Sequence, residues 1–181
     1  WLKQFIDRKD ASLIERADVV FASSGPLYTY CQGFNENVHL VSNGTDTALA
    51  DKASNTPKDA VNIPHPVLGY VGAIFDKLDF ELLRYLAEEH PEWSMLMVGP
   101  TGAASEGDEK RISSLREKSN VFFVGSKHRE ELPGYYEAID VDLMPYELTE
   151  HTEHIFPLKM FEYMDFVKPI VSTDIPSARQ F

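Results

Sequence analysis

The sequence has little of what would direct a protein to nucleic acid, to a membrane or to an oxidising compartment. Its 17 lysines and arginines are outnumbered by 29 acidic residues, and no basic stripe in the sequence could neutralise nucleic-acid phosphates. No apolar run approaches the roughly 18 residues of a membrane helix. The one cysteine, Cys31, cannot form an internal disulfide. We therefore predict a cytoplasmic protein with no nucleic-acid partner and no integral membrane segment in this stretch. Any contact with the inner face of a membrane would come from other parts of the protein.

The length and the two ends of the sequence predict a part of a larger protein. The 181 residues suffice for one domain, or for one domain and part of a second, and 43% apolar content is typical of a packed globular protein. The sequence starts at Trp1 without a signal-peptide layout and stops at Phe181, within what reads as the first turn of a helix. We therefore expect a piece of a longer chain.

A regular alternation of strand and helix patterns begins at about residue 65. Short runs rich in small and β-branched residues alternate with amphipathic stretches, an order typical of parallel strands joined by crossover helices. Strands are expected at residues 67–74, 93–98, 121–124, 141–144 and 169–172, and helices at residues 79–90, 109–118, 129–139 and from 157 onwards. The pattern predicts an α/β fold with a Rossmann-like, doubly wound parallel sheet.

The first third of the sequence is organised differently. It reads as a helix, a strand, a capped helix and a second strand, at residues 1–16, 17–22, 25–33 and 38–42. We assign residues 1–46 to the tail end of a preceding Rossmann-like domain and residues 47–64, which are poor in large apolar groups, to a linker. Residues 65–181 then form a second domain that is truncated at its C-terminus.

The segment at residues 156–174, FPLKMFEYMDFVKPIVSTD, carries the clearest chemical signal. Pro157 is expected at the first position of a helix, where its fixed φ is favourable and its missing N–H is not needed. The free N–H groups near Leu158 and Lys159, with the positive end of the helix, would form a seat for a phosphate. An apolar stripe at helical spacing is expected to contain Pro157, Met160, Phe161 and Met164.

Lys159 and Glu162 fall on the opposite side of this helix, about one turn apart. A cation beside the phosphate seat suits a diphosphate, and a carboxylate one turn deeper can accept hydrogen bonds from ribose hydroxyls. The pair therefore predicts a nucleotide site. The alternative is an ordinary amphipathic helix that carries a solvated ion pair.

The same segment resembles a known family. Residues 157–163, PLKMFEY, and 168–173, KPIVST, are similar to the donor-binding helix and following strand of GT-B glycosyltransferases, the retaining enzymes called family 4 or glycosyl transferases group 1. Further stretches that match in order and spacing are ADVVFASS, VSNGTD, GYVGAI, DFELLRYLAEEHP, GP, NVFFVG, ELPGY and DVDLMP, at residues 17–24, 41–46, 69–74, 79–91, 99–100, 120–125, 131–135 and 140–145. The sequence departs from the family where His154 replaces a glutamate and where Val167 replaces a small residue.

The resemblance implies that residues 65–181 bind a nucleotide-sugar donor, beyond the carboxyl ends of the strands. Gly72 would let the backbone approach a phosphate, or it would only form a tight bend. Lys77 is the nearby candidate for a basic residue that holds the diphosphate, whereas Ser126 and Lys127 would contact the base unless they lie in a solvated loop. The predicted donor-binding residues are Gly72, Ala73, Lys77, Gly99, Ser126, Lys127, Tyr146, His154, Pro157, Leu158, Lys159 and Glu162.

Residues 150–154, EHTEH, raise the question of a metal site. They do not match H-E-x-x-H, and we expect them in a loop before a helix rather than on one. Enzymes of the resembled family generally need no bound metal, so we predict neither a metal nor any other cofactor. His154 would line the sugar pocket or be exposed to solvent.

The predicted activity is that of a hexosyltransferase-type glycosyltransferase of polysaccharide biosynthesis. It would move a sugar, with retention, from a nucleoside diphosphate to a glycan or lipid-linked acceptor. Lys159 would stabilise the departing diphosphate, while the remaining catalytic groups would lie mostly in the missing domain. The isolated piece should therefore be weak or inactive. Two alternatives stay open, a GT-B nucleotide-sugar epimerase and a non-catalytic nucleotide-binding module.

Overall fold

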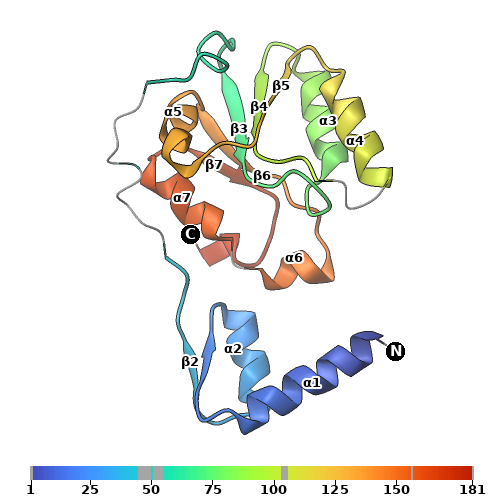
Figure 1. The fold of residues 1–181 in the computed structure, drawn as a ribbon, viewed down its shortest axis with the longest axis vertical. Helices are drawn as coiled ribbons and strands as arrows, with labels where there is room; N and C mark the ends of the chain where they lie inside the picture. Colours follow the sequence, from blue (N-terminus) through green and yellow to red (C-terminus); the bar gives the residue numbers. More distant parts are fainter. Residues whose placement is uncertain (1, 45–49, 51–54, 103–105, 156, 181) are drawn as a thin grey trace.

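The computed structural model describes the chain except at residues 1, 45–49, 51–54, 103–105, 156 and 181. Two structural units are visible, a small one at the N-terminal end and a larger one that holds the remaining elements (Figure 1). Each has its own hydrophobic core. The predicted α/β architecture with parallel strands is confirmed.

The small unit consists of α1 (Leu2–Arg16), β1 (Val20–Ala22), α2 (Gly25–Gln32) and β2 (Val38–Leu40). Its two strands are parallel and joined through α2, whose first turn is capped by the Ser24 hydroxyl accepting from the Leu27 N–H. Cys31 lies buried in its core, and burial raises the pKa of the thiol. This makes Cys31 a packing residue rather than a nucleophile.

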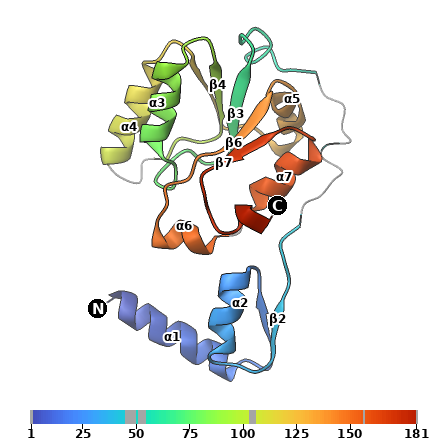
Figure 2. The ribbon, with the colours of Figure 1, turned by 180° about the vertical axis from the view of Figure 1, so that it is seen from behind.

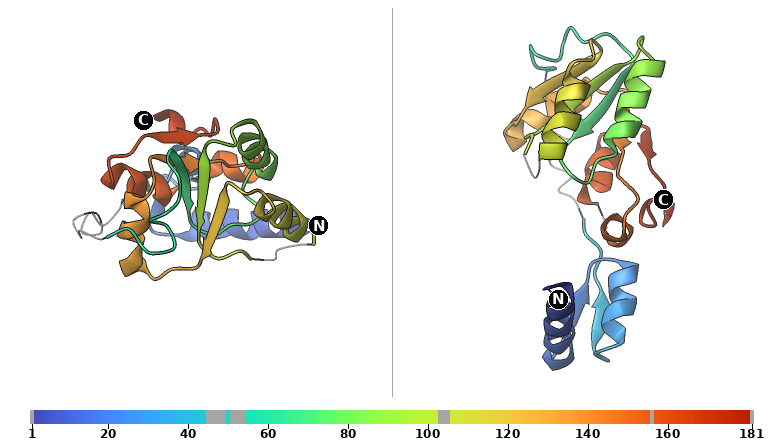
Figure 3. Two further views of the ribbon diagram at one scale, coloured as in Figure 1. Left: turned by 90° about the horizontal axis from the view of Figure 1, so that it is seen from above. Right: turned by 90° about the vertical axis from the view of Figure 1, so that its right-hand side faces the viewer.

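The larger unit is a five-stranded parallel sheet in the order β5-β4-β3-β6-β7. The strands are β3 (Val67–Val71), β4 (Ser94–Val98), β5 (Val121–Gly125), β6 (Val141–Met144) and β7 (Ile170–Ser172). One face of the sheet is covered by α3 (Phe80–Glu89) and α4 (Glu106–Arg116), and the other by α5 (Leu132–Glu137) and α7 (Leu158–Asp165) (Figure 3). The direction of winding reverses between β3 and β6, so a ligand crevice is expected at their carboxyl ends.

Local sequence explains why the helices begin where they do. The Asp79 carboxylate accepts from the Leu82 N–H at the start of α3, which buries Phe80, Leu83 and Ala87. Leu132 opens α5 after the 3₁₀ turn Arg129–Glu131. The chain ends with a second 3₁₀ turn, Ala178–Gln180.

Three details of the predicted helices are wrong. Residues 150–154 form a short helix, α6 (Glu150–His154), because Thr149 and Thr152 cap each other's backbone N–H groups. Pro157 is the N-cap of α7 rather than its first residue. The buried side of α7 includes Tyr163, which is 0% exposed, whereas Met164 is 37% exposed.

Part of the segment assigned to the linker packs against the larger unit. Ala60 and Ile63 are buried in its core. Asp59 accepts hydrogen bonds from the Lys127 ammonium and the Tyr135 hydroxyl, at 2.7 Å and 2.8 Å. The segment around residue 60 therefore belongs structurally to the larger unit.

Val167 is strained, and its replacement by glycine should stabilise the protein. Its φ of 54° lies in the left-handed region, and its side chain is 87% exposed between α7 and β7. A β-branched residue in this conformation costs roughly 1–2 kcal/mol. Replacement by glycine removes that cost, but the greater freedom of glycine in the unfolded state cancels part of the gain. We expect Val167→Gly to raise the free energy of unfolding in urea by about 1 kcal/mol. Val167→Ala keeps the Cβ atom and should recover less; an equal gain from both variants would contradict the explanation.

Candidate functional site

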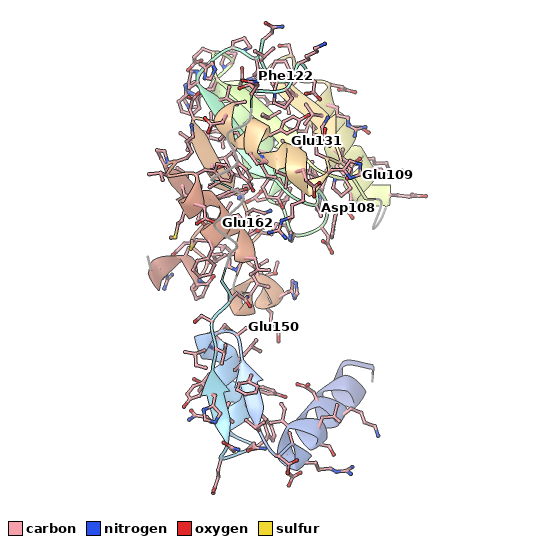
Figure 4. The ribbon with its side chains drawn as sticks, turned by 60° about the vertical axis from the view of Figure 1, so that its left-hand side comes forward. Asp108, Glu109, Phe122, Glu131, Glu150 and Glu162 are labelled. Atoms are coloured by element: carbon pink, nitrogen blue, oxygen red, sulfur yellow. The ribbon has the colours of Figure 1, made fainter. Side chains whose placement is uncertain are left out.

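A pocket of about 380 Å³ lies where the winding of the sheet reverses. Its wall is formed mainly by the loops after β3 and β6 and by the start of α7. Glu162 lies on α7, on the side of the larger unit that faces the small unit (Figure 4). The lining residues are Asn43, Lys77, Tyr146, Ile155, Pro157, Leu158, Lys159 and Glu162. Six of the predicted donor-binding residues are thus brought together here.

The start of α7 directs the Lys159 side chain inwards, towards the end of β3. Its ammonium donates a hydrogen bond to the carbonyl of Val71, and it lies 4.9 Å and 5.9 Å from the ring centres of Tyr70 and Tyr163. Aromatic faces attract a cation and partly replace its lost water. This is not the solvated ion pair of the alternative interpretation, because the cation is enclosed by the protein.

Two glycines make this approach possible. Gly72 has a φ of 148°, and a Cβ atom there would collide with the Lys159 ammonium. Gly99, with a φ of 141°, in turn leaves room for the carbonyl of Gly72. In the structure Gly72 makes room for the Lys159 side chain, and its predicted contact with a phosphate stays a prediction.

The electrostatics of Lys159 are unusual for a lysine. Burial lowers the pKa of Lys159 to about 8. The negative charges of Glu162 and Asp142 act to raise this pKa, whereas the positive charge of Lys77 lowers it further. Lys77 lies 5.5 Å from the centre of the Tyr146 ring at the same pocket. Two lysines and one carboxylate therefore lie close together at this pocket. Their net positive charge would be neutralised by an incoming diphosphate.

Buried tyrosines, which sequence reasoning missed, support the pocket from below. The Tyr163 hydroxyl donates to the carbonyl of Leu143 and accepts from the Val71 N–H, each at 3.2 Å, and so joins β3 to β6. The Tyr70 hydroxyl donates to the carbonyl of Ala73 at 3.1 Å. Tyr163 does stand in the PLKMFEY stretch, but a tyrosine in such a stretch indicates only core packing when the sequence is read alone.

Asp142 is a second residue that sequence reasoning missed. It lies in β6, is 0% exposed, and neither carboxyl oxygen has a hydrogen-bond partner among the described residues. Burial raises its pKa to about 7, although Lys168 and Lys159 act to lower it. A buried carboxyl group without hydrogen-bond partners destabilises the folded state when it is ionised.

The remaining predicted residues lie elsewhere or outside the description. Ser126 is exposed and does not line the pocket. Lys127 is paired with Asp59 and lies 5.0 Å from the Tyr135 ring centre. The side chain of His154 is outside the described residues.

Two negative observations apply only to the described part of the chain. It contains no group of three or more His, Cys, Asp or Glu side chains that could hold a metal ion. It also has no helix long and apolar enough to cross a membrane.

Solved structures resemble the whole chain in fold. Anabaena HepE in complex with UDP and glucose matches with a TM-score of 0.74 at 21% identity, over 96% of this chain and 49% of HepE. Sucrose-phosphate synthase from Thermosynechococcus elongatus matches with a TM-score of 0.64 at 20% identity, over 92% of this chain and 43% of the synthase. At such identities the likeness shows the fold alone.

Sequence comparisons give the family. TuaH of Bacillus subtilis (strain 168), named as a candidate teichuronic acid biosynthesis glycosyltransferase, is 34% identical over 181 residues, which cover 97% of this chain and 45% of TuaH. The chain thus spans about half the length of the relatives it matches. Residues 65–181, which hold the β3–β6 crevice and α7, match the family described as Glycosyl transferases group 1. The chain therefore belongs to the glycosyl transferases group 1 family, and its larger unit has the fold of a GT-B C-terminal domain.

Proposed function

We propose that the pocket binds a nucleoside-diphosphate sugar and that the whole protein transfers the sugar, with retention, to a glycan or lipid-linked acceptor. The observation that carries the proposal is the enclosed Lys159 ammonium beside Glu162, at the β3–β6 crevice. Burial of this ammonium is unfavourable for the fold even though Glu162 and the Val71 carbonyl partly compensate it, so its presence is better explained by an anionic ligand.

The positively charged and negatively charged residues of the pocket would bind different parts of the donor. Lys159, Lys77 and the first backbone N–H groups of α7 would stabilise the negative charge that develops on the departing diphosphate. Glu162 would accept hydrogen bonds from the ribose hydroxyls. Because the described lining contains only this carboxylate, it offers no pair of carboxylates for the acid–base chemistry of an epimerase.

The relatives suggest where to look for the substrates. HepE is described in complex with UDP-glucose, which makes a uridine nucleotide the first donor to test. TuaH is named for teichuronic acid biosynthesis, which favours a polysaccharide acceptor. We place the reaction in the cytoplasm and expect the chain alone to bind the donor but to transfer weakly. Transfer by a full-length protein would separate the enzyme from a non-catalytic nucleotide-binding module.

A thermal-shift panel of UDP, GDP, ADP and dTDP tests the proposal, with Glu162→Gln as the matched variant. A nucleotide that binds the folded state alone raises its stability by mass action. We expect one base to be preferred. Affinity for that nucleotide should fall roughly 10- to 100-fold in Glu162→Gln, since a charge-assisted hydrogen bond contributes about 1.5–3 kcal/mol.

The variant keeps the shape of the side chain and removes only its charge. Unchanged nucleotide affinity in a folded Glu162→Gln protein would remove Glu162 from the ribose site. No stabilisation of the wild type by any of the four nucleotides would contradict donor binding itself.

A further inference from the structure

A buried carboxyl group in the middle of the sheet has no part in the donor binding described so far. Asp142 lies on β6, in register with Gly69 of β3 and Ile170 of β7. Strand β6 thus runs between β3 and β7, and α7 lies beside β7 (Figure 2). Asp142 is 0% exposed and is not among the described residues that line the pocket. Any effect that it has on a ligand must therefore pass through another residue.

A short chain of contacts leads from Lys159 to this carboxyl group. The Lys159 ammonium donates to the carbonyl of Val71. The N–H of Val71 donates to the Tyr163 hydroxyl, which in turn donates to the carbonyl of Leu143, the residue next to Asp142. The two charges also act on each other, since Asp142 raises the pKa of Lys159 and Lys159 lowers the pKa of Asp142.

Each of the two groups is unfavourable for the fold without an opposite charge. Neither carboxyl oxygen of Asp142 has a hydrogen-bond partner among the described residues, so its ionised form destabilises the folded state. Burial of the Lys159 ammonium lowers its pKa to about 8. An opposite charge nearby favours the ionised form of such a group. Because an uncharged side chain in place of Asp142 would suit the fold better, the carboxyl is better explained by its effect on Lys159.

Other titratable groups also face this pair, from the strands and helices around it. They are Glu162, Lys77, Tyr70 and Tyr163 around Lys159, and Lys168, Tyr136 and Tyr163 around Asp142. Of these, Lys168 acts on the Asp142 carboxyl more strongly than Lys159 does. Glu162 lines the pocket and is assigned to the ribose, so a bound donor would engage it. Asp142 stays available to Lys159 whether or not a donor is bound.

We propose that Asp142 is a positioning residue for Lys159, because its carboxylate, behind the wall of the pocket, holds the lysine in the ammonium form that binds a diphosphate. The inference rests on the proposed function, in which Lys159 is a ligand of the phosphates. It adds that the charge of the donor site is controlled from within the sheet, by a residue that the ligand does not contact. The pH range over which the site accepts a diphosphate then depends on Asp142.

The ionisation of Lys159 can be measured without any ligand, by NMR titration of the 181-residue chain with isotope-labelled lysine. The signal of Lys159 is the one that is missing from Lys159→Met. Asp142→Asn removes the charge of the carboxyl and keeps its shape, so Lys159 should lose its proton roughly half a pH unit to one pH unit lower than in the wild type. Asp140→Asn is the matched control: it alters a neighbouring carboxyl, keeps Asp142 and should leave the titration of Lys159 unchanged.

Calorimetry of UDP binding gives the second measurement, with another nucleoside diphosphate in its place if the thermal-shift panel prefers a different base. Wild-type affinity should decline with a midpoint near pH 8, where Lys159 loses its proton. In Asp142→Asn this midpoint should move down with the titration of Lys159, so that affinity at pH 8 is about two- to fivefold below that of the wild type. At pH 6 the two affinities should agree, whereas a purely structural defect would lower affinity at both pH values.

The contrary results can be told apart. An unchanged titration of Lys159 in Asp142→Asn would overturn the inference. A higher affinity of this variant for UDP at pH 8 would also overturn it, because the carboxylate would then only repel the ligand. Neither result removes the proposed function, which depends on binding by the wild type. A wild type that binds no nucleotide would overturn the proposed function, and the NMR titration would still decide whether Asp142 holds the charge of Lys159.

Discussion

Replacing Asp142 by asparagine should stabilise the protein, and by far more at pH 8 than at pH 5. Burial raises the pKa of this carboxyl from 3.8 to about 7, so the folded state holds a proton that the unfolded state releases. Stability from this group is fully present below about pH 4 and is lost as the pH rises towards 7. An asparagine has nothing to ionise and should escape this loss.

The expected effect is large because one pKa unit corresponds to about 1.4 kcal/mol. Between pH 5 and pH 8 the wild type should lose on the order of 3 kcal/mol relative to Asp142→Asn. Lys159 and Lys168 face the carboxyl and act in the opposite direction, and the buried tyrosines Tyr136 and Tyr163 also lie near it. Urea unfolding of both proteins at the two pH values measures the difference directly.

Asp140, two residues earlier, provides a matched control with the opposite sign. Burial raises its pKa, but hydrogen bonds from the Val67 N–H and from His65 outweigh this and hold the pKa below its usual value. Asp140→Asn should therefore destabilise the protein at neutral pH and have less effect as the pH falls through the folded-state pKa. A stability difference between the wild type and Asp142→Asn that is the same at pH 5 and pH 8 would show that Asp142 does not carry a raised pKa.

The sheet could be predicted from sequence because its strands are short, mainly apolar runs between turn residues. Parallel strands with a reversal of winding then bring Lys77, Tyr146 and the start of α7 to one edge, as the general rule for such sheets requires. Lys159 and Glu162 were found in this way, from their spacing on one helix. The site was predictable as far as backbone topology determines it.

The direction of individual side chains could not be predicted, because it depends on contacts between distant residues. Lys159 binds the carbonyl of Val71, 88 positions away, and this contact requires the absence of a side chain at Gly72. Lys127 is held by Asp59, 68 positions away. Asn43, on the segment that follows β2, lines the same pocket as residues more than 30 positions away. None of these pairings leaves a periodic pattern in the sequence.

Replacing Lys159 should separate binding from stability. Lys159→Met should lower affinity for the nucleoside diphosphate roughly 10- to 100-fold, because a charged hydrogen bond contributes about 1.5–3 kcal/mol. Affinity for the corresponding nucleoside should hardly change, since it has no phosphate. Burial lowers the pKa of the ammonium from 10.5 to about 8, so at pH 7 the charged side chain lowers the free energy of unfolding. After the loss of the hydrogen bond to Val71, we expect Lys159→Met to raise the free energy of unfolding by on the order of 2 kcal/mol.

The same pKa predicts how donor binding depends on pH. A diphosphate binds the ammonium form, which is predominant at pH 7 and about one-tenth populated at pH 9 if the pKa is about 8. Affinity of the wild type should thus fall about tenfold between these pH values. Lys159→Arg stays charged throughout and should show a flat profile, as should Lys159→Met at its lower affinity. A wild-type profile as flat as that of Lys159→Met would mean that the ammonium is not a ligand of the phosphates. Equal losses for nucleoside and diphosphate in Lys159→Met would mean that the side chain acts through the fold.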